Sequence, residues 1–168
     1  MANKYVSNNV GTLTEVEALV TSAGAADAGK IPALDSAGRL SNTLMPTGIG
    51  ADTATIQASE ALAAGAPVNI WNSAGSFRVR NADASTAGKE AHGFVLTAVS
   101  SGASATVYFE GNNTQVTGMT PGPVFLSTTP GQYTATAPSA AGNVVQRCGI
   151  ATSATSINFE ASQPIVLA

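Results

Sequence analysis

The sequence of 168 residues has few charged side chains, and this scarcity narrows the range of functions. Charged residues make up 10% of the chain, against about 25% in typical soluble domains. Its lysines and arginines form no run, and the formal net charge is −3. Proteins that bind nucleic acid carry clustered basic residues. We therefore expect no nucleic-acid partner, and a largely uncharged surface that suits packing against neighbouring subunits.

Reactive and metal-binding residue types are also scarce. Cys148 is the only cysteine and cannot form an intramolecular disulfide, and His92 is the only histidine. A zinc site needs three or four cysteine, histidine or carboxylate ligands, so we expect none. Asp27, Asp35 and Asp52 lack the spacing of a calcium-binding loop, and the glycine-rich stretches lack phosphate-binding fingerprints. The sequence predicts neither a metal nor a cofactor.

Long apolar runs are missing as well. No stretch approaches the roughly 18 apolar residues of a membrane-spanning helix, and residues 1–5 lack the apolar core of a signal peptide. We expect a protein made in a reducing cytoplasm, with no membrane partner.

The most informative feature present is an internal repeat. Val68 and Gly93 recur 56 positions later as Val124 and Gly149, and the sequence VYFE at 107–110 returns as INFE at 157–160. A fixed internal period indicates that one small unit was duplicated to build a larger core. The repeat predicts two copies, at about residues 64–110 and 121–160, within a domain that spans residues 51–168.

Short alternating segments with glycine and proline between them predict an all-β fold, a sandwich or a barrel. In the first copy we expect a hairpin that turns at residues 72–75 and places Phe77 and Val79 on the core face. Further expectations are a helical turn at 59–65 with Ser59 as its N-cap, and strands at 53–58, 91–99, 106–110 and, as a closing edge strand, 164–167.

Residues 1–50 predict an extended N-terminal arm. Residues 13–20 could form a strand or a short helix, residues 21–29 are typical of a linker, and residues 35–38 predict a turn. Ordering a backbone residue costs about 1 to 2 kcal/mol, and this segment has few large side chains to offset that cost. We expect the arm to become ordered only on docking.

The repeat also bears on the candidate catalytic residues. His92 and Cys148 occupy equivalent positions just before Gly93 and Gly149, and Glu110 and Glu160 follow equivalent strands. A catalytic pair needs mutual geometry and an orienting group, whereas a duplication alone explains these matches. We therefore interpret all four residues as structural and expect no catalytic site, including a glycosidase-like carboxylate pair.

The two copies differ at a few outward-facing positions. Trp71 lies on the strand face opposite Val68, where the second copy has Ser127, and Arg78 and Arg80 point away from the core. Tryptophan is enriched at binding hot spots. We interpret Trp71, Arg78 and Arg80 as a partner or self-interface, unless the arm or the closing strand covers this face.

Two groups of segments resemble virion proteins of tailed bacteriophages. Residues 24–40, with the sequence GAADAGKIPALDSAGRL, and the following Leu44-Met45-Pro46 resemble a segment recurrent in phage fibres and head proteins. Residues 61–68 (ALAAGAPV), 93–95 (GFV) and 122–127 (GPVFLS) are similar to phage capsid cement and head-decoration proteins.

This resemblance implies a non-enzymatic protein on the capsid exterior of a virion, made in the cytoplasm of a host bacterium. Its implied partners are the major capsid protein and other copies of itself, in a homotrimer. The alternative is a tail-fibre or spike adaptor, or a receptor-binding head fibre. The arm residues expected to contact the capsid are Tyr5, Val6, Lys30, Ile31, Leu34, Arg39, Leu40 and Leu44.

Overall fold

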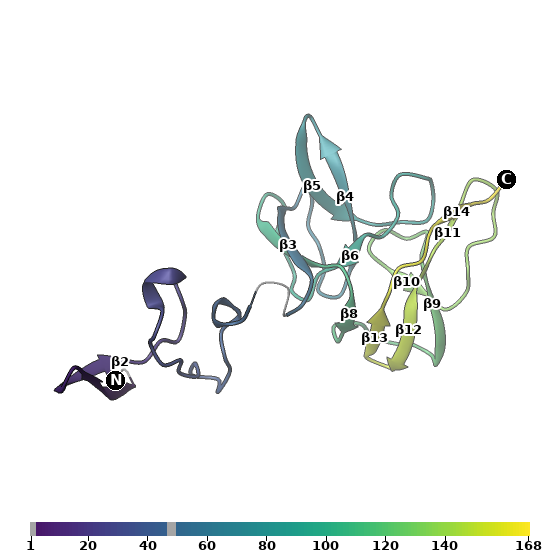
Figure 1. The fold of residues 1–168 in the computed structure, drawn as a ribbon. Coiled ribbons are helices and arrows are strands. Elements are labelled where there is room, and N and C mark those ends of the chain that lie inside the picture. The colour runs from purple at the N-terminus through teal and green to yellow at the C-terminus, as the bar shows by residue number, and fades with distance from the viewer. Residues whose placement is uncertain (1–2, 47–49) are drawn as a thin grey trace. The chain divides into compact units, whose positions relative to one another are not determined.

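The computed structural model describes residues 3–46 and 50–168 (Figure 1). The chain divides into two compact units, Met1–Gly50 and Ala51–Ala168. Among the described residues the regular elements are β-strands, apart from two single-turn 3₁₀ helices, η1 (Ala25–Asp27) and η2 (Asn42–Leu44). The predicted all-β class is confirmed.

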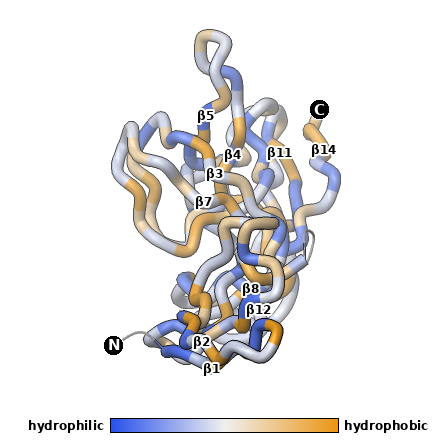
Figure 2. Tube along the Cα trace, turned by 60° about the vertical axis from the view of Figure 1, so that its left-hand side comes forward, coloured by the Kyte–Doolittle hydropathy of each residue, from blue (hydrophilic) through white to orange (hydrophobic). Residues whose placement is uncertain are grey.

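The first unit begins with a β-hairpin. Strand β1 (Lys4–Asn9) pairs with the antiparallel strand β2 (Thr12–Glu17). The pairing register places Val6 and Leu13 on one face of the hairpin and Tyr5 and Val16 on the other, and hydrophobic and hydrophilic residues are mixed along both strands (Figure 2). Val10 and Gly11 form the turn with φ values of 52° and 86°, the primed geometry that matches the twist of a hairpin.

The rest of the first unit consists of short local structures. Residues 21–29, predicted as a linker, contain η1, where the Asp27 carboxylate pairs with Lys30 at 2.9 Å. The predicted turn at 35–38 is confirmed, because the Gly38 amide donates to the Asp35 carbonyl. No described residue of this unit is buried.

The second unit contains two five-stranded antiparallel sheets and a small two-stranded one. The first sheet has the order β3-β7-β6-β4-β5, and the second has the order β8-β13-β12-β9-β10. The strands of the first are β3 (Thr53–Gln57), β4 (Pro67–Ser73), β5 (Ser76–Asn81), β6 (Gly93–Phe94) and β7 (Ser104–Tyr108). Those of the second are β8 (Gly111–Asn113), β9 (Gly122–Leu126), β10 (Tyr133–Thr134), β12 (Arg147–Ser153) and β13 (Ser156–Phe159). The predicted closing strand exists as β14 (Ile165–Val166), which pairs with β11 (Val144–Val145).

The two large sheets share their strand order and their central register. If the five strands of each sheet are numbered from one to five along the chain, both sheets have the spatial order one, five, four, two, three. Val68 pairs with Gly93 in the first sheet, and Val124 pairs with Gly149 in the second. Identical topology and register are what a duplicated β-unit requires.

Two sequence predictions in the first copy are wrong. Residues 59–65 form no helix, because Leu62 makes an antiparallel bridge to Val99 that holds this segment extended. The expected strand at 91–99 is regular only at β6 and at the Val99 bridge. In both places pairing with a distant segment overrides local propensity.

The β4–β5 hairpin also differs from the prediction. Strand β4 continues to Ser73, and the turn is the two-residue Ala74–Gly75 pair, whose φ values are both positive. Val79 is buried as predicted, but Phe77 is 81% exposed. The hairpin extends beyond the core, so the strand face that buries Val79 has nothing to cover it at Phe77 (Figure 1).

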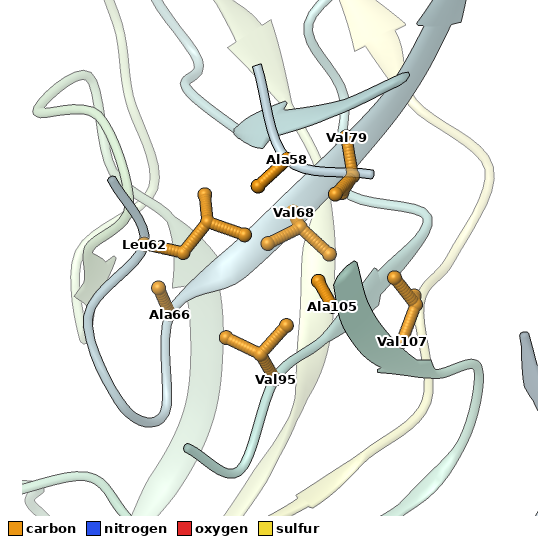
Figure 3. Close-up of a cluster of buried hydrophobic side chains, with 8 residues drawn as sticks. All are labelled: Ala58, Leu62, Ala66, Val68, Val79, Val95, Ala105 and Val107. Atoms are coloured by element: carbon orange, nitrogen blue, oxygen red, sulfur yellow. The ribbon is translucent and has the colours of Figure 1, made fainter. Parts of the chain in front are cut away.

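Besides a smaller cluster of Val116, Val124, Ala151 and Ile157, two hydrophobic clusters hold the second unit together. One contains eight aliphatic side chains from residues 58–107, including Leu62, Val68 and Val79 (Figure 3). The other takes residues from both copies. In it, Phe94 of the first copy lies with its ring centroid 5.2 Å from that of Phe159 of the second. This shared cluster joins the two copies in one unit.

Candidate functional site

A cavity of about 490 Å³ is lined by residues of both copies. Its acidic residues are Glu90 and Glu110 from the first copy and Glu160 from the second. Glu110 directly precedes β8, and Glu160 directly follows β13. The eleven lining residues include three acidic residues and no lysine or arginine. The Glu90 carboxylate accepts a hydrogen bond from the Gly88 amide at 2.9 Å, whereas Glu110 and Glu160 are exposed.

The sequence did not predict that Glu110 and Glu160 share a cavity. Their equivalence in the repeat was apparent, but a duplication places the same acid on two strand ends whether or not the ends approach each other. Glu90 was missed altogether, because its equivalent in the second copy is Gln146. Only the arrangement of the two copies brings these side chains to one place.

His92 also lines this cavity and is exposed. Its Nδ1 accepts a hydrogen bond from the backbone amide of Ile70 at 3.0 Å. A ring nitrogen that accepts is unprotonated, so the proton of the neutral imidazole lies on Nε2, which is a donor. In this tautomer the ring has only its Nε2–H donor free, because the Nδ1 lone pair is taken by the Ile70 amide.

Gln146 fixes the backbone beside the cavity. Its side chain is buried, accepts a hydrogen bond from the Ala91 amide at 2.8 Å and donates to the Ala91 carbonyl at 3.0 Å. These two bonds imitate one rung of a β-ladder between the copies. The polar groups of Gln146 beside the cavity are therefore hydrogen-bonded. The acidic residues of the cavity suit a positively charged group such as an ammonium or guanidinium.

Cys148 lies in a different environment from His92, although the two positions are equivalent in the sequence. A β-bulge between Arg147 and Gly149 adds a residue to β12 opposite β9, and Cys148 is fully buried in the cluster shared by the copies. Burial raises the pKa of its thiol to about 12. A neutral buried thiol is a poor nucleophile.

Trp71 and Arg80, expected at an interface, are largely engaged within their own unit. The Arg80 guanidinium lies 4.7 Å from the centroid of the Trp71 ring, and its Nε donates to the Asn69 side chain at 3.0 Å. Nε1 of Trp71 donates to Oγ of Ser59 at 3.2 Å. Trp71 and Arg80 therefore have polar or cation–π partners within their own unit. Arg78 has no ion pair among the described residues.

The Asp83 carboxylate is a buried structural charge. Burial alone would raise its pKa, but hydrogen bonds from Ser85 and Lys89 outweigh burial and lower the pKa of Asp83. Its pairing with Lys89 at 3.1 Å connects the two ends of the loop that precedes Glu90. This ion pair supports the segment on which Glu90 and His92 are placed.

Of the arm residues expected to contact a partner, six are exposed and two, Tyr5 and Leu44, are half-buried. Val6 is 67% exposed. The sequence reading missed Val10, which is 99% exposed at the tip of the β1–β2 hairpin, and Leu13, which lies on the same face as Val6. The Gly11 of the turn is the one local signal from which this hairpin could have been found, because residues 4–9 do not alternate in hydropathy.

Over residues 3–46 and 50–168, no group of three histidine, cysteine or acidic side chains is arranged to hold a metal ion. No helix in the described part of the chain is long and apolar enough to cross a membrane. Comparison with models of protein families, with curated proteins and with solved structures gave no match to this chain.

Proposed function

We propose that this chain is a non-enzymatic structural protein of a tailed-bacteriophage virion, which binds the outside of the major capsid shell and stabilises it. The observation that carries the proposal is the first unit, in which no described residue is buried. The resemblance of residues 24–40 and of the repeated segments to virion proteins supplies the biological setting.

The first unit exposes large apolar side chains along its whole length. A two-stranded hairpin is marginally stable on its own in water, and exposed apolar side chains contribute nothing to its stability until they are covered. The marginal hairpin and the exposed apolar side chains support a first unit that becomes stable only when it docks on a partner. The exposed apolar residues are Val6, Val10, Leu13, Val20, Ile31, Leu34, Leu40 and Met45.

In this proposal the second unit supplies a rigid body and the first unit supplies the capsid contacts. We take the two large sheets as copies of one β-unit, closed as a sandwich or a barrel. A protein that binds only the assembled shell stabilises it by mass action. Association of three copies around a local symmetry axis would add avidity, so modest contacts from each arm would give lasting attachment.

Deleting residues 1–45 is expected to abolish binding to capsid shells that lack this protein. The remaining second unit contains every buried residue of the described chain, so it should keep its fold. Co-sedimentation with shells measures the binding, and circular dichroism with thermal unfolding measures the fold. A full-length variant with Ile31, Leu34 and Leu40 changed to serine tests the same contacts without truncation.

Two outcomes would contradict this assignment of roles. Retained shell binding by the deleted protein would place the capsid contacts on the second unit. Unfolding of the deleted protein would show that the second unit depends on the arm. In that case the triple serine variant decides, because it keeps the chain length and removes only the apolar contacts.

The alternative is a tail-fibre or spike adaptor, or a receptor-binding head fibre that recognises a host glycan. Aromatic residues are 5% of the chain, with one tryptophan, and the Trp71 ring already has Arg80 over it. Among the described residues Phe77 is the aromatic side chain that is exposed, and a single exposed ring is little surface for stacking on a sugar. Immunogold labelling of virions separates the alternatives, because label at the tail instead of over the head would exclude capsid decoration.

The shared cavity makes the non-enzymatic part of the proposal testable. A glycosidase would use Glu110 and Glu160 as acid and base or nucleophile, and the Glu110→Gln and Glu160→Gln variants would then each lose nearly all turnover. We expect no hydrolysis of bacterial surface polysaccharide above background by the wild type, measured as released reducing sugar. Hydrolysis that disappears in both variants would overturn the proposal.

A further inference from the structure

The β4–β5 hairpin is longer than its counterpart in the second copy. Ile70 pairs with Val79 in the first copy, and the equivalent pair in the second is Leu126 with Tyr133. Beyond this pair the first copy continues as a regular ladder to a turn at residues 74–75, whereas in the second copy the ladder ends. The extension is a feature that the duplicated fold does not need.

The extension carries an exposed aromatic side chain and a half-buried basic side chain that forms no ion pair within the described chain. Phe77 is exposed on the face that buries Val79. Arg78 lies on the opposite face, across from Trp71, and has no ion pair among the described residues. Arg80, by contrast, donates to Asn69 and to a carbonyl of the 83–90 loop.

The cavity between the copies has the complementary chemistry. Glu110 and Glu160 form no ion pair in the described part of the chain. Beside the three acidic residues, the lining includes the apolar residues Pro164 and Phe109, and Phe109 is half-buried because it also packs against the first hydrophobic cluster. A guanidinium forms strong charge-assisted bonds with carboxylates, and an aromatic ring packs on such apolar side chains.

We propose that the Phe77–Arg78 tip of one copy docks into the acidic cavity of a second copy. Arg78 pairs with Glu110 and Glu160, and Phe77 packs against Phe109 and Pro164. The contact is heterologous, with two different surfaces meeting, and it generates a closed ring when the rotation between copies closes. This inference rests on the self-association in the proposed function and identifies the surfaces that produce it.

Charge reversal of the full-length protein tests the contact in solution, without virions. We expect the wild type to associate in sedimentation equilibrium and the Arg78→Glu variant to associate at least about tenfold more weakly, since charged interface pairs couple strongly. Glu110→Arg should weaken association similarly, and Phe77→Ser should also weaken it. The double variant Arg78→Glu with Glu110→Arg should associate more tightly than either single variant.

Lys4→Glu is the control for a change of charge, since Lys4 is an exposed basic residue of the first unit that belongs to neither proposed surface. It should leave association unchanged, and circular dichroism confirms the fold of each variant. A wild type that stays monomeric up to millimolar concentration would overturn the inference, as would a double variant that associates no better than the singles. Failure to bind shells while these results hold would instead refute the capsid role alone.

Discussion

Gly149→Ala is expected to destabilise the second unit by about 3 kcal/mol or more, from the combined cost of overpacking and a strained backbone. A Cβ at this position would lie 2.0 Å from the backbone carbonyl oxygen of Asn158, and φ is +136°. The obstructing atom belongs to the paired strand β13, so only a shift of the sheet can relieve the clash. Urea unfolding monitored by circular dichroism measures the loss.

Gly93→Ala tests the equivalent position of the first copy, where the Cβ would lie 2.4 Å from the carbonyl oxygen of Tyr108. We expect it to destabilise the unit in the same way. Gly102→Ala is the control, since φ there is +82° and nothing lies within 4 Å of the added Cβ. It should cost about 1 kcal/mol from the left-handed backbone alone. Equal losses at Gly149 and Gly102 would show that the close strand approach is absent.

These glycines explain why the repeat could be recognised in the sequence. Val68 and Gly93 pair in one sheet as Val124 and Gly149 do in the other, and each glycine admits a backbone oxygen of the neighbouring strand. The geometry excludes a side chain at either glycine. The fold therefore requires the same spacing between the paired valine and glycine in both copies. The all-β class was predictable from the short alternating segments that glycine and proline separate.

The hairpins were less predictable because their lengths are not fixed by the core. The sequence alignment of the copies matches Phe77 with Tyr133, but the structure matches Val79 with Tyr133. A shift of two residues keeps the inward and outward alternation, so the pattern alone cannot detect it. By the spacing of 56 positions Arg80 matches Thr136, but by strand pairing it corresponds to Thr134.

The cavity could not be predicted from the sequence, because it depends on how the two copies pack. The equivalent positions of His92 and Cys148 suggested equivalent environments. One inserted residue in β12, the bulge before Gly149, instead turns Cys148 into the core while His92 lies at the cavity. Bulges of this kind redirect a side chain without a distinct sequence signal.

The burial of Cys148 predicts a loss of stability at alkaline pH. The pKa of its thiol is about 12 in the folded protein, against a value of 9.0 for an unburied thiol. Above pH 9 the unfolded chain therefore releases this proton while the folded chain retains it, and the free energy of unfolding decreases. The stabilisation is complete below pH 9 and is lost as the pH rises toward 12, at about 1.4 kcal/mol per pH unit.

The comparison of wild type with Cys148→Ala isolates this effect. Burial also raises the pKa of Tyr133 well above 10, so both proteins lose stability as the unfolded tyrosine ionises near pH 10, and the difference between the two proteins reports the thiol. By pH 10 the wild type should have lost about 1.4 kcal/mol that the alanine variant does not lose, measured by urea unfolding at each pH. Equal losses in the two proteins would show that the Cys148 thiol is accessible to water, and that the bulge before Gly149 does not turn it into the core shared by the two copies.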